Sequence, residues 1–193
     1  MIYIKYSGTI PDRKMIRMME EEFIDISMIS GWSHEVVSEN FQTMTKKVKD
    51  DLFDEETDEE FGEEPGEEEK ITLSSSDVYL DGIIVDVAED MDPLAFTFDR
   101  RGKLATISFH AVKTKGLANK LTVKKYEFLY YPYVKIYTNS FENHRKIVKI
   151  LDYVKKTYIK DLEVLDTSFY WENRDIEDLK VRMWKAAQKQ TIF

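Results

Sequence analysis

The side chains best suited to acid–base chemistry near neutral pH are the three histidines, His34, His110 and His144. His144 falls on the apolar side of a predicted helix, where a buried histidine with satisfied hydrogen bonds is the common arrangement. His110 ends a predicted strand near Lys113 and Lys115, and positive neighbours favour the neutral form of an imidazole. His110 is therefore the best histidine candidate for a general base.

A second group of candidates surrounds Trp171, in the segment SFYWENRD, where a predicted strand gives way to a predicted helix. Two carboxyl groups in one pocket can act as general acid and base in hydrolysis, and Asp166 with Glu172 is a candidate pair. The spacing alone does not select this pair, and the simpler interpretation is a group of core aromatic side chains beside a helix cap. The catalytic candidates of a hydrolase hypothesis are therefore His110, Asp166, Glu172 and Asp175.

The sequence predicts no metal site and no bound cofactor. It contains no cysteine, which excludes thiolate zinc sites, iron–sulfur clusters and disulfides. The segment DGIIVDVAEDMDP, residues 81–93, is rich in the carboxylates that hard cations prefer, but its spacing does not fit a calcium-binding EF-hand loop. The HExxH, P-loop, dinucleotide-binding and GxSxG motifs are absent, which disfavours the most familiar enzyme classes.

Charge is distributed unevenly along the chain of 193 residues, whose formal net charge is -9. Residues 50–69 contain 13 acidic side chains and no basic one. Residues 100–160, in contrast, contain 15 basic side chains and only three acidic ones. The net negative charge of the chain therefore includes a basic region, residues 100–160, that could attract a negatively charged partner.

The acidic segment is predicted to be a flexible loop over residues 50–70. It contains Gly62, Pro65 and Gly66 and few apolar side chains, so it cannot bury enough surface to order itself. Its carboxylates suit electrostatic recognition of a basic partner protein, although a charge run of this kind can also serve solubility alone. The candidate contact residues are Asp54, Glu55, Glu56, Asp58, Glu59 and Glu60.

Tyrosines and phenylalanines alternate with lysines in the basic region, notably in LTVKKYEFLYYPYVKIY, residues 121–137. Rings that stack on bases and cations that hold the phosphate backbone are the components of a surface for single-stranded nucleic acid. The other interpretation is an amphipathic sheet whose rings face the core. In the helix that follows, Arg145, Lys149 and Lys156 lie on the polar side and are further candidates for charged contacts. If the acidic segment covers this basic region, it competes with nucleic acid for the same cations.

The periodicity of apolar residues predicts which elements carry these side chains. Residues 2–6 alternate as a strand, and apolar residues recur at helical spacing over residues 11–26. A less clear helix is expected over residues 34–48. Beyond the acidic segment the period changes to two, with a turn at residues 99–102 that suits a hairpin. The expected strands cover residues 78–88, 94–98, 103–110, 121–131 and 133–138.

The clearest element is a helix that runs from a cap at Asn139, with Glu142 as its reciprocal partner, to about Lys160. One side of this helix is apolar and the other is basic. A strand over residues 162–171 and a capped helix over residues 176–189 complete the chain.

Strands grouped between helices, without regular alternation, favour an α+β fold over a doubly wound parallel sheet. We expect a single domain over residues 1–193, in which an antiparallel β-meander packs against N-terminal and C-terminal helices and the acidic loop is an insertion. The start of the chain lacks a secretory signal and no apolar run is long enough to cross a bilayer, which predicts a cytoplasmic protein.

The leading functional hypothesis is a small non-enzymatic module that recognises a basic protein through the acidic loop. One alternative is a nucleic-acid-binding protein that is masked by its own acidic loop, and the other is a hydrolase with a carboxylate or histidine site. A contiguous basic surface with exposed tyrosines favours nucleic-acid binding, whereas a pocket with ionisable groups favours the hydrolase.

Overall fold

The computed structural model describes residues 2–40, 71–72, 79–89, 91–115 and 121–190. Side chains are described throughout these ranges except at residues 39–40, 71–72, 109–115, 121–128 and 189–190. The predicted flexible loop of residues 50–70 lies outside the described residues.

A three-stranded antiparallel sheet forms the centre of the fold. Its strands are β1 (Ile2–Ser7) in the middle, β8 (Val134–Thr138) on one side and β9 (Glu163–Asp166) on the other. Because both outer strands run antiparallel to β1, they are parallel to each other, and helix α3 (Phe141–Thr157) connects them. This is a split β-α-β unit, in which a strand from the start of the chain lies between two later strands.

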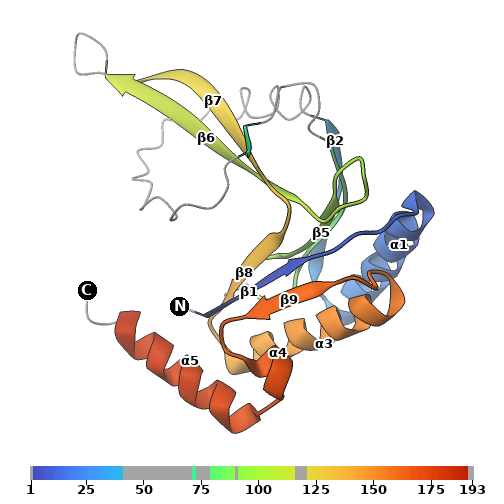
Figure 1. Ribbon diagram of the computed structural model, residues 1–193, viewed down its shortest axis with the longest axis vertical. Coiled ribbons are helices and arrows are strands. Elements are labelled where there is room, and N and C mark those ends of the chain that lie inside the picture. The colour runs from blue at the N-terminus through green and yellow to red at the C-terminus, as the bar shows by residue number, and fades with distance from the viewer. Residues whose placement is uncertain (1, 41–70, 73–78, 90, 116–120, 191–193) are drawn as a thin grey trace.

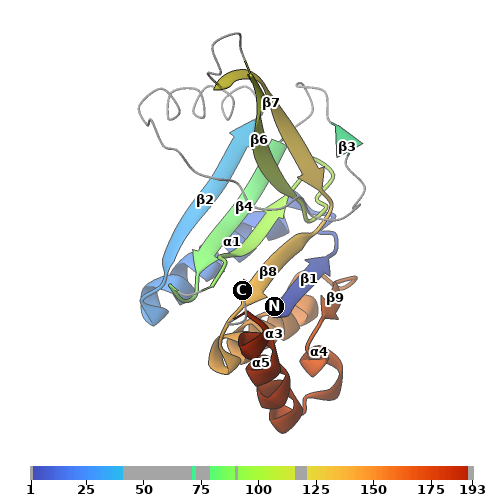
Figure 2. The ribbon, with the colours of Figure 1, turned by 90° about the vertical axis from the view of Figure 1, so that its left-hand side faces the viewer.

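The two faces of this sheet differ in chemistry, as the alternation over residues 2–6 predicts. Ile4 and Tyr6 are buried in the core, whereas Tyr3 and Lys5 are half-buried on the other face. Figure 2 shows the strands in front of α3 and of α1 (Arg13–Ser30), so these two helices cover one face only. The second face is left to polar and aromatic side chains.

Helix α3 is amphipathic, as its sequence predicts. Its apolar side is buried in the core, and Lys149 and Lys156 are exposed on the opposite side. The cap lies one residue later than expected: Ser140 is the N-cap in place of Asn139, because the Ser140 hydroxyl accepts the N–H of Asn143 at 3.1 Å.

A second antiparallel sheet contains β2 (Ser33–Asn40), β4 (Tyr79–Asp86) and β5 (Leu94–Phe98), in that order. Helix α1 packs on this sheet, and the rings of Phe23 and Phe96 meet with 4.9 Å between their centroids. Both rings are fully buried and belong to the same hydrophobic core as the first sheet.

The helix predicted over residues 34–48 is wrong for its described part, because residues 33–40 form strand β2. Val36 and Val37 are β-branched and favour an extended backbone. All eight residues of β2 pair with β4 in a continuous antiparallel register. Pairing with an apolar neighbouring strand outweighs the weak helical periodicity of this segment.

Strands β6 (Thr106–Lys115) and β7 (Leu121–Tyr131) form a long hairpin that projects from the rest of the described structure (Figures 1 and 2). The short strand β3 (Ile71–Thr72) pairs with β7, which completes the third antiparallel sheet. His110 belongs to β6, and its side chain lies outside the described residues.

The strand predicted over residues 162–171 is shorter in the structure. Strand β9 ends at Asp166, and the short helix α4 (Tyr170–Asn173) follows. Phe169, between them, has a φ of 63°, a left-handed conformation that interrupts the extended backbone. The last helix, α5 (Ile176–Gln190), agrees with the prediction.

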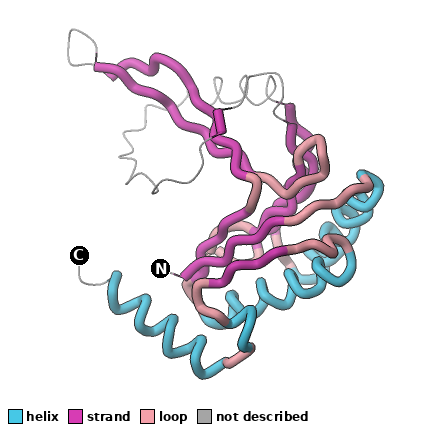
Figure 3. The backbone as a smooth tube through the Cα atoms, in the orientation of Figure 1, coloured by secondary structure: helices cyan, strands magenta, loops and turns pink. Residues whose placement is uncertain are grey.

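These elements make an α+β fold with antiparallel sheets, as predicted (Figure 3). The hairpins β4–β5 and β6–β7 correspond to the expected meander, and α1 and α3 supply the helical layer that closes the core. Among the described residues, no helix combines the length and the apolar character needed to span a bilayer.

The turn at residues 99–102 forms and binds the segment after β1, but the predicted hairpin of residues 94–98 with 103–110 is limited to a bridge between Phe98 and Leu104. Strand β6 begins only at Thr106, and β5 and β6 pair with β4 and β7. The Asp99 carboxylate accepts the N–H groups of Arg101 and Lys103 at 2.8 and 3.0 Å. Gly102 has a φ of 75°, and a Cβ at this position would lie 1.9 Å from the carbonyl oxygen of Ile10. Glycine is therefore required here both for the backbone conformation and for the close approach of the two segments.

Gly102→Ala is expected to lower the free energy of unfolding by about 2–4 kcal/mol, because left-handed strain adds to a backbone clash. Gly31→Ala is the matched control, since Gly31 has a φ of 69° but nothing lies within 4 Å of a new Cβ. That control is expected to cost only about 1 kcal/mol. Urea denaturation followed by circular dichroism measures both changes, and equal losses would contradict the proposed role of the Ile10 contact.

Candidate functional site

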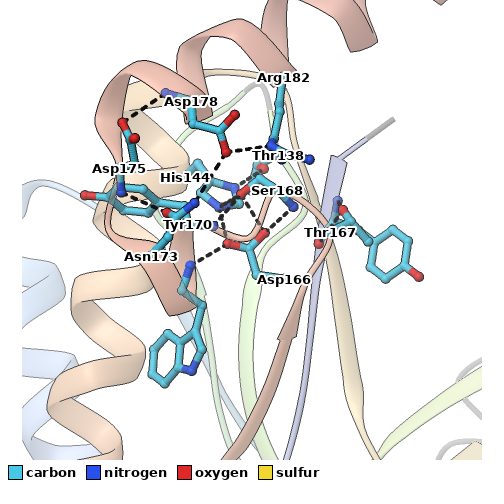
Figure 4. A network of polar contacts seen from close by, with 12 residues as sticks. Thr138, His144, Asp166, Thr167, Ser168, Tyr170, Asn173, Asp175, Asp178 and Arg182 are labelled. Carbon is cyan, nitrogen blue, oxygen red and sulfur yellow. Dashed lines mark hydrogen bonds and ion pairs between the residues drawn. The ribbon is translucent and has the colours of Figure 1, made fainter.

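Buried hydrogen bonds around His144 join β8, α3 and the end of β9 (Figure 4). His144 Nδ1 lies 2.7 Å from the Thr138 hydroxyl, and Nε2 lies 3.0 Å from Asp166 Oδ2. Ser168 Oγ is 3.0 Å from the same Nε2 and 2.7 Å from Asp166 Oδ1. We call Thr138, His144, Asp166 and Ser168 the buried clamp. Its hydroxyl, imidazole and carboxylate follow the order found in hydrolase triads.

The hydrogen-bond pattern fixes where the protons of the buried clamp lie. A carboxylate can only accept, so Ser168 donates its single hydroxyl proton to Asp166 Oδ1. Ser168 Oγ can then only accept from His144 Nε2, which must carry a proton and share it with Asp166 Oδ2. In the neutral imidazole, Nδ1 accepts the proton of Thr138. Each of these side-chain atoms therefore has a hydrogen-bond partner within the buried clamp.

The Asp166 carboxylate is surrounded by donors. Oδ1 accepts the backbone N–H of Ser168 at 2.8 Å in addition to its hydroxyl, and Oδ2 accepts the backbone N–H of Trp171 at 3.0 Å in addition to His144. Burial raises the pKa of Asp166, but the hydrogen bonds from His144 and Ser168 outweigh it and hold the pKa below the ordinary value of 3.8. Asp166 is therefore a carboxylate at neutral pH.

The buried clamp is closed to solvent. The side chains of His144 and Asp166 are both 0% exposed, and Thr138 and Ser168 are buried as well. No substrate atom can reach the Thr138 hydroxyl in this conformation, so the triad-like order does not make a hydrolytic site. The prediction that His144 is a satisfied buried histidine is confirmed.

Only Asp166 of the catalytic candidates belongs to the buried clamp. Glu172 is exposed on α4, and Asp175 is exposed and caps α5 by accepting two N–H groups of its first turn. The candidate pair of Asp166 with Glu172 thus combines a buried and an exposed carboxylate. His34 is exposed on β2, and the side chain of His110 is not described.

The candidates for charged contacts divide between two parts of the chain. The six acidic candidates within residues 54–60 lie outside the described residues. Lys149 and Lys156 are exposed on α3, and Arg145 is half-buried with its guanidinium 5.3 Å from the centroid of the Phe141 ring. These basic side chains are on the helical side of the first sheet.

The opposite face of the first sheet carries tyrosines and lysines in a regular pattern. The register places Tyr3 opposite Tyr137 and Lys5 opposite Lys135. The rings of Tyr3 and Tyr137 meet edge to face, with 5.9 Å between their centroids. The Lys135 ammonium lies 4.5 Å from the centroid of Tyr3 and 5.4 Å from that of Tyr137, within the range of cation–π attraction.

The same pattern continues toward the β6–β7 hairpin. The Lys5 ammonium lies 3.6 Å from the centroid of the Tyr133 ring, which in turn contacts the Tyr131 ring at 5.6 Å. Leu165, opposite Lys5 on the outer strand, is 53% exposed. The half-buried side chains of this set are called the tyrosine–lysine face: Tyr3, Lys5, Tyr131, Tyr133, Lys135 and Tyr137.

Part of this face was visible in the sequence. Tyr133, Lys135 and Tyr137 belong to the aromatic and basic run of residues 121–137. Tyr3 and Lys5 were missed, because they come from the start of the chain and meet that run only through strand pairing. The signal that could have found them is the period of two over residues 2–6, which places an aromatic and a cationic side chain on one face.

The buried clamp lies directly behind the tyrosine–lysine face. Thr138 and Asp166 pair with the β1 residues on either side of Tyr3. Thr167, which follows Asp166, accepts the N–H of Tyr3 on its hydroxyl oxygen at 2.9 Å, and donates its own hydroxyl and N–H to the Tyr3 carbonyl at 3.0 and 3.1 Å. Thr167, which lies between the clamp residues Asp166 and Ser168, therefore fixes the backbone of Tyr3.

Metal chemistry finds no support in the described part of the chain, where no group of three or more His, Asp or Glu side chains is placed to hold an ion.

Comparison with known proteins does not indicate a function: no family model, no curated protein and no solved structure matches this chain. Function must therefore be inferred from the chemistry of these side chains.

Asp166→Asn is expected to lower the free energy of unfolding by about 2–4 kcal/mol at pH 7. In the variant, the amide nitrogen of asparagine replaces one carboxylate oxygen and cannot accept a hydrogen bond. It would lie against either the N–H and hydroxyl of Ser168, or against the donors of His144 and Trp171. Because the folded pKa of Asp166 lies below 3.8, its contribution to stability is full above about pH 5 and is lost as the pH falls through the lowered folded pKa.

Urea denaturation between about pH 2 and pH 7 measures both effects. The Asn variant is expected to lose part of the acid-dependent decline in stability that the wild-type protein shows. Glu172→Gln is the matched control, because this exposed carboxylate lies only six residues away, and we expect a change within about 0.5 kcal/mol. Equal effects of the two substitutions would contradict the role assigned to Asp166.

Proposed function

We propose that this protein is a non-enzymatic binding module whose tyrosine–lysine face binds single-stranded nucleic acid. The observation that carries the proposal is the interleaving of rings and ammonium groups on one sheet face, with Lys135 between Tyr3 and Tyr137 and Lys5 over Tyr133. Bases stack on such rings with little regard to sequence, and stacking contributes about 1–3 kcal/mol per base. The lysines supply charge for the phosphates.

Single strands fit this face better than duplexes. In Figure 2 the strands of the first sheet lie in front of α3, and the tyrosines of the face are half-buried, so part of each ring is exposed to an unpaired base. A duplex hides the flat sides of its bases in the stack and offers mainly phosphates and groove edges. The proposal therefore includes a preference for unpaired strands.

Binding also agrees better than hydrolysis with the placement of ionisable groups. The one described arrangement that follows the order of a catalytic triad is the buried clamp, whose His144 and Asp166 are 0% exposed. General acid–base catalysis requires the catalytic group to come within hydrogen-bonding distance of the substrate. The clamp supports the face from behind and does not contact a bound strand.

The acidic segment, residues 50–69, lies outside the described residues, so recognition of a basic protein through it stays a prediction. Its possible competition with nucleic acid is a prediction of the same kind. Deleting residues 50–69 distinguishes recognition of a basic protein from competition with nucleic acid. Tighter oligonucleotide binding at low salt supports competition for shared cations, whereas loss of a stoichiometric basic partner from a pull-down supports protein recognition.

Tyr3→Leu and Tyr137→Leu are each expected to weaken binding of a labelled oligo(dT) about tenfold, because an aliphatic side chain preserves packing but offers no ring for stacking. Fluorescence anisotropy at about 50 mM salt measures the dissociation constants. The same oligonucleotide in a duplex is expected to bind more weakly than the single strand.

Tyr153→Leu is the matched control for this experiment. Tyr153 is also partly exposed, but it belongs to α3 on the opposite side of the sheet, so its loss should leave the dissociation constant unchanged. Circular dichroism verifies that all three variants are folded. The proposal is ruled out if the wild-type protein does not bind the single-stranded oligonucleotide. It is also ruled out if the Tyr3 and Tyr137 variants bind it with the wild-type dissociation constant.

A further inference from the structure

A second group of cations lies where the β5–β6 turn meets the start of α1. The first turn of α1 and the β5–β6 turn are far apart in the sequence, but backbone hydrogen bonds hold them together. Ile10 N–H donates to the Gly102 carbonyl at 2.8 Å, and Leu104 N–H donates to the Gly8 carbonyl at 2.9 Å. We call the exposed cations of these two segments the basic corner: Arg13, Lys14, Arg100, Arg101 and Lys103.

A tyrosine ring orients two of the arginines. The Arg13 and Arg100 guanidinium carbons lie 5.3 and 5.8 Å from the centroid of the same ring, that of Tyr79. A guanidinium placed over a ring keeps its N–H groups free to form hydrogen bonds in its own plane. Both guanidinium groups are thus held in position before a ligand binds, which lowers the entropy cost of binding.

The five cations of the basic corner outnumber the two carboxylates of the same segments, Asp12 and Asp99, and none of the five forms an ion pair within the described part of the chain. The two nearest carboxylates in the sequence serve the backbone. Asp12 accepts the N–H of Lys14 as the cap of α1, and Asp99 accepts two N–H groups of its own turn.

The basic corner lies near strand β7, which ends in the tyrosine–lysine face. Tyr130 of β7 donates its hydroxyl to Asp99 at 2.9 Å, and Asp99 directly precedes Arg100 of the corner. Successive side chains of a strand point to opposite faces, so the Asp99 turn meets β7 on the face opposite to Tyr131. A bound nucleic-acid strand must therefore pass around β7 to contact both the rings and these cations.

We infer that the basic corner is a second contact site for the phosphate backbone of the strand that the tyrosine–lysine face binds. The inference rests on the proposed function. Guanidinium groups form paired, charge-assisted hydrogen bonds with phosphate oxygens. A nucleic-acid strand is favoured over an acidic protein because the corner includes the Tyr79 ring beside Arg13 and Arg100, and carboxylates have no use for a ring.

The test compares Arg13→Gln/Arg100→Gln with a matched control, Lys149→Gln/Lys156→Gln, which removes two exposed charges from α3. The probe is a fluorescein-labelled oligo(dT) of about 20 nucleotides, titrated from about 50 to 200 mM KCl. Loss of two phosphate contacts is expected to reduce the slope of log K against log salt by about 1.4. The control is expected to keep the wild-type slope, and Tyr3→Leu to weaken binding at every salt concentration without changing the slope.

The outcomes separate this inference from the proposed function. If the arginine variant keeps the wild-type slope while Tyr3→Leu weakens binding, the basic corner is not a contact and the proposed function stands. If the wild-type protein binds no oligonucleotide, both fail. If polyglutamate of matched charge binds the wild-type protein but not the arginine variant, and does not displace the oligonucleotide, the corner binds an acidic protein partner and the inference is overturned.

Discussion

Two strands that do not touch each other are held at a fixed spacing by one buried histidine. Strands β8 and β9 both pair with β1, and His144 reaches behind β1 to bond Thr138 of one and Asp166 of the other. Buried polar groups need hydrogen-bond partners, and the side chains of Thr138 and Asp166 both find one on the ring of His144. The same constraint sets the turn into α4, because Asp166 also accepts backbone N–H groups of that turn.

This arrangement gives the two faces of one sheet different chemistry. The buried clamp and the apolar side of α3 stabilise the sheet from behind, so the front face does not need a covering layer to stay in register. Tyrosines suit such a face, since their rings pack against neighbours while their hydroxyl ends tolerate water. The lysines between them reduce the exposed apolar area by lying over the rings.

The sequence was informative where the determining interactions are local. The turn at Asp99, the two-sided character of α3 and the alternation of β1 were predictable because each depends on neighbours within a few residues. Strand β2 was not, since its state depends on pairing with β4 across more than forty residues. Burial of His144 followed from its place on the helix, but its partners did not, because Thr138 and Asp166 lie in different strands.

The overall charge of -9 does not argue against a polyanionic ligand. At about 0.1 M salt, charges more than about 10 Å apart are largely screened, so a strand at the surface responds to the cations beside it and not to the total. At low salt the net negative charge slows the approach of a nucleic acid, while the local cations strengthen the contact once it forms. The proposed function therefore relies on ligands that bring both phosphates and stackable rings, because the cations beside the face act together with its tyrosines.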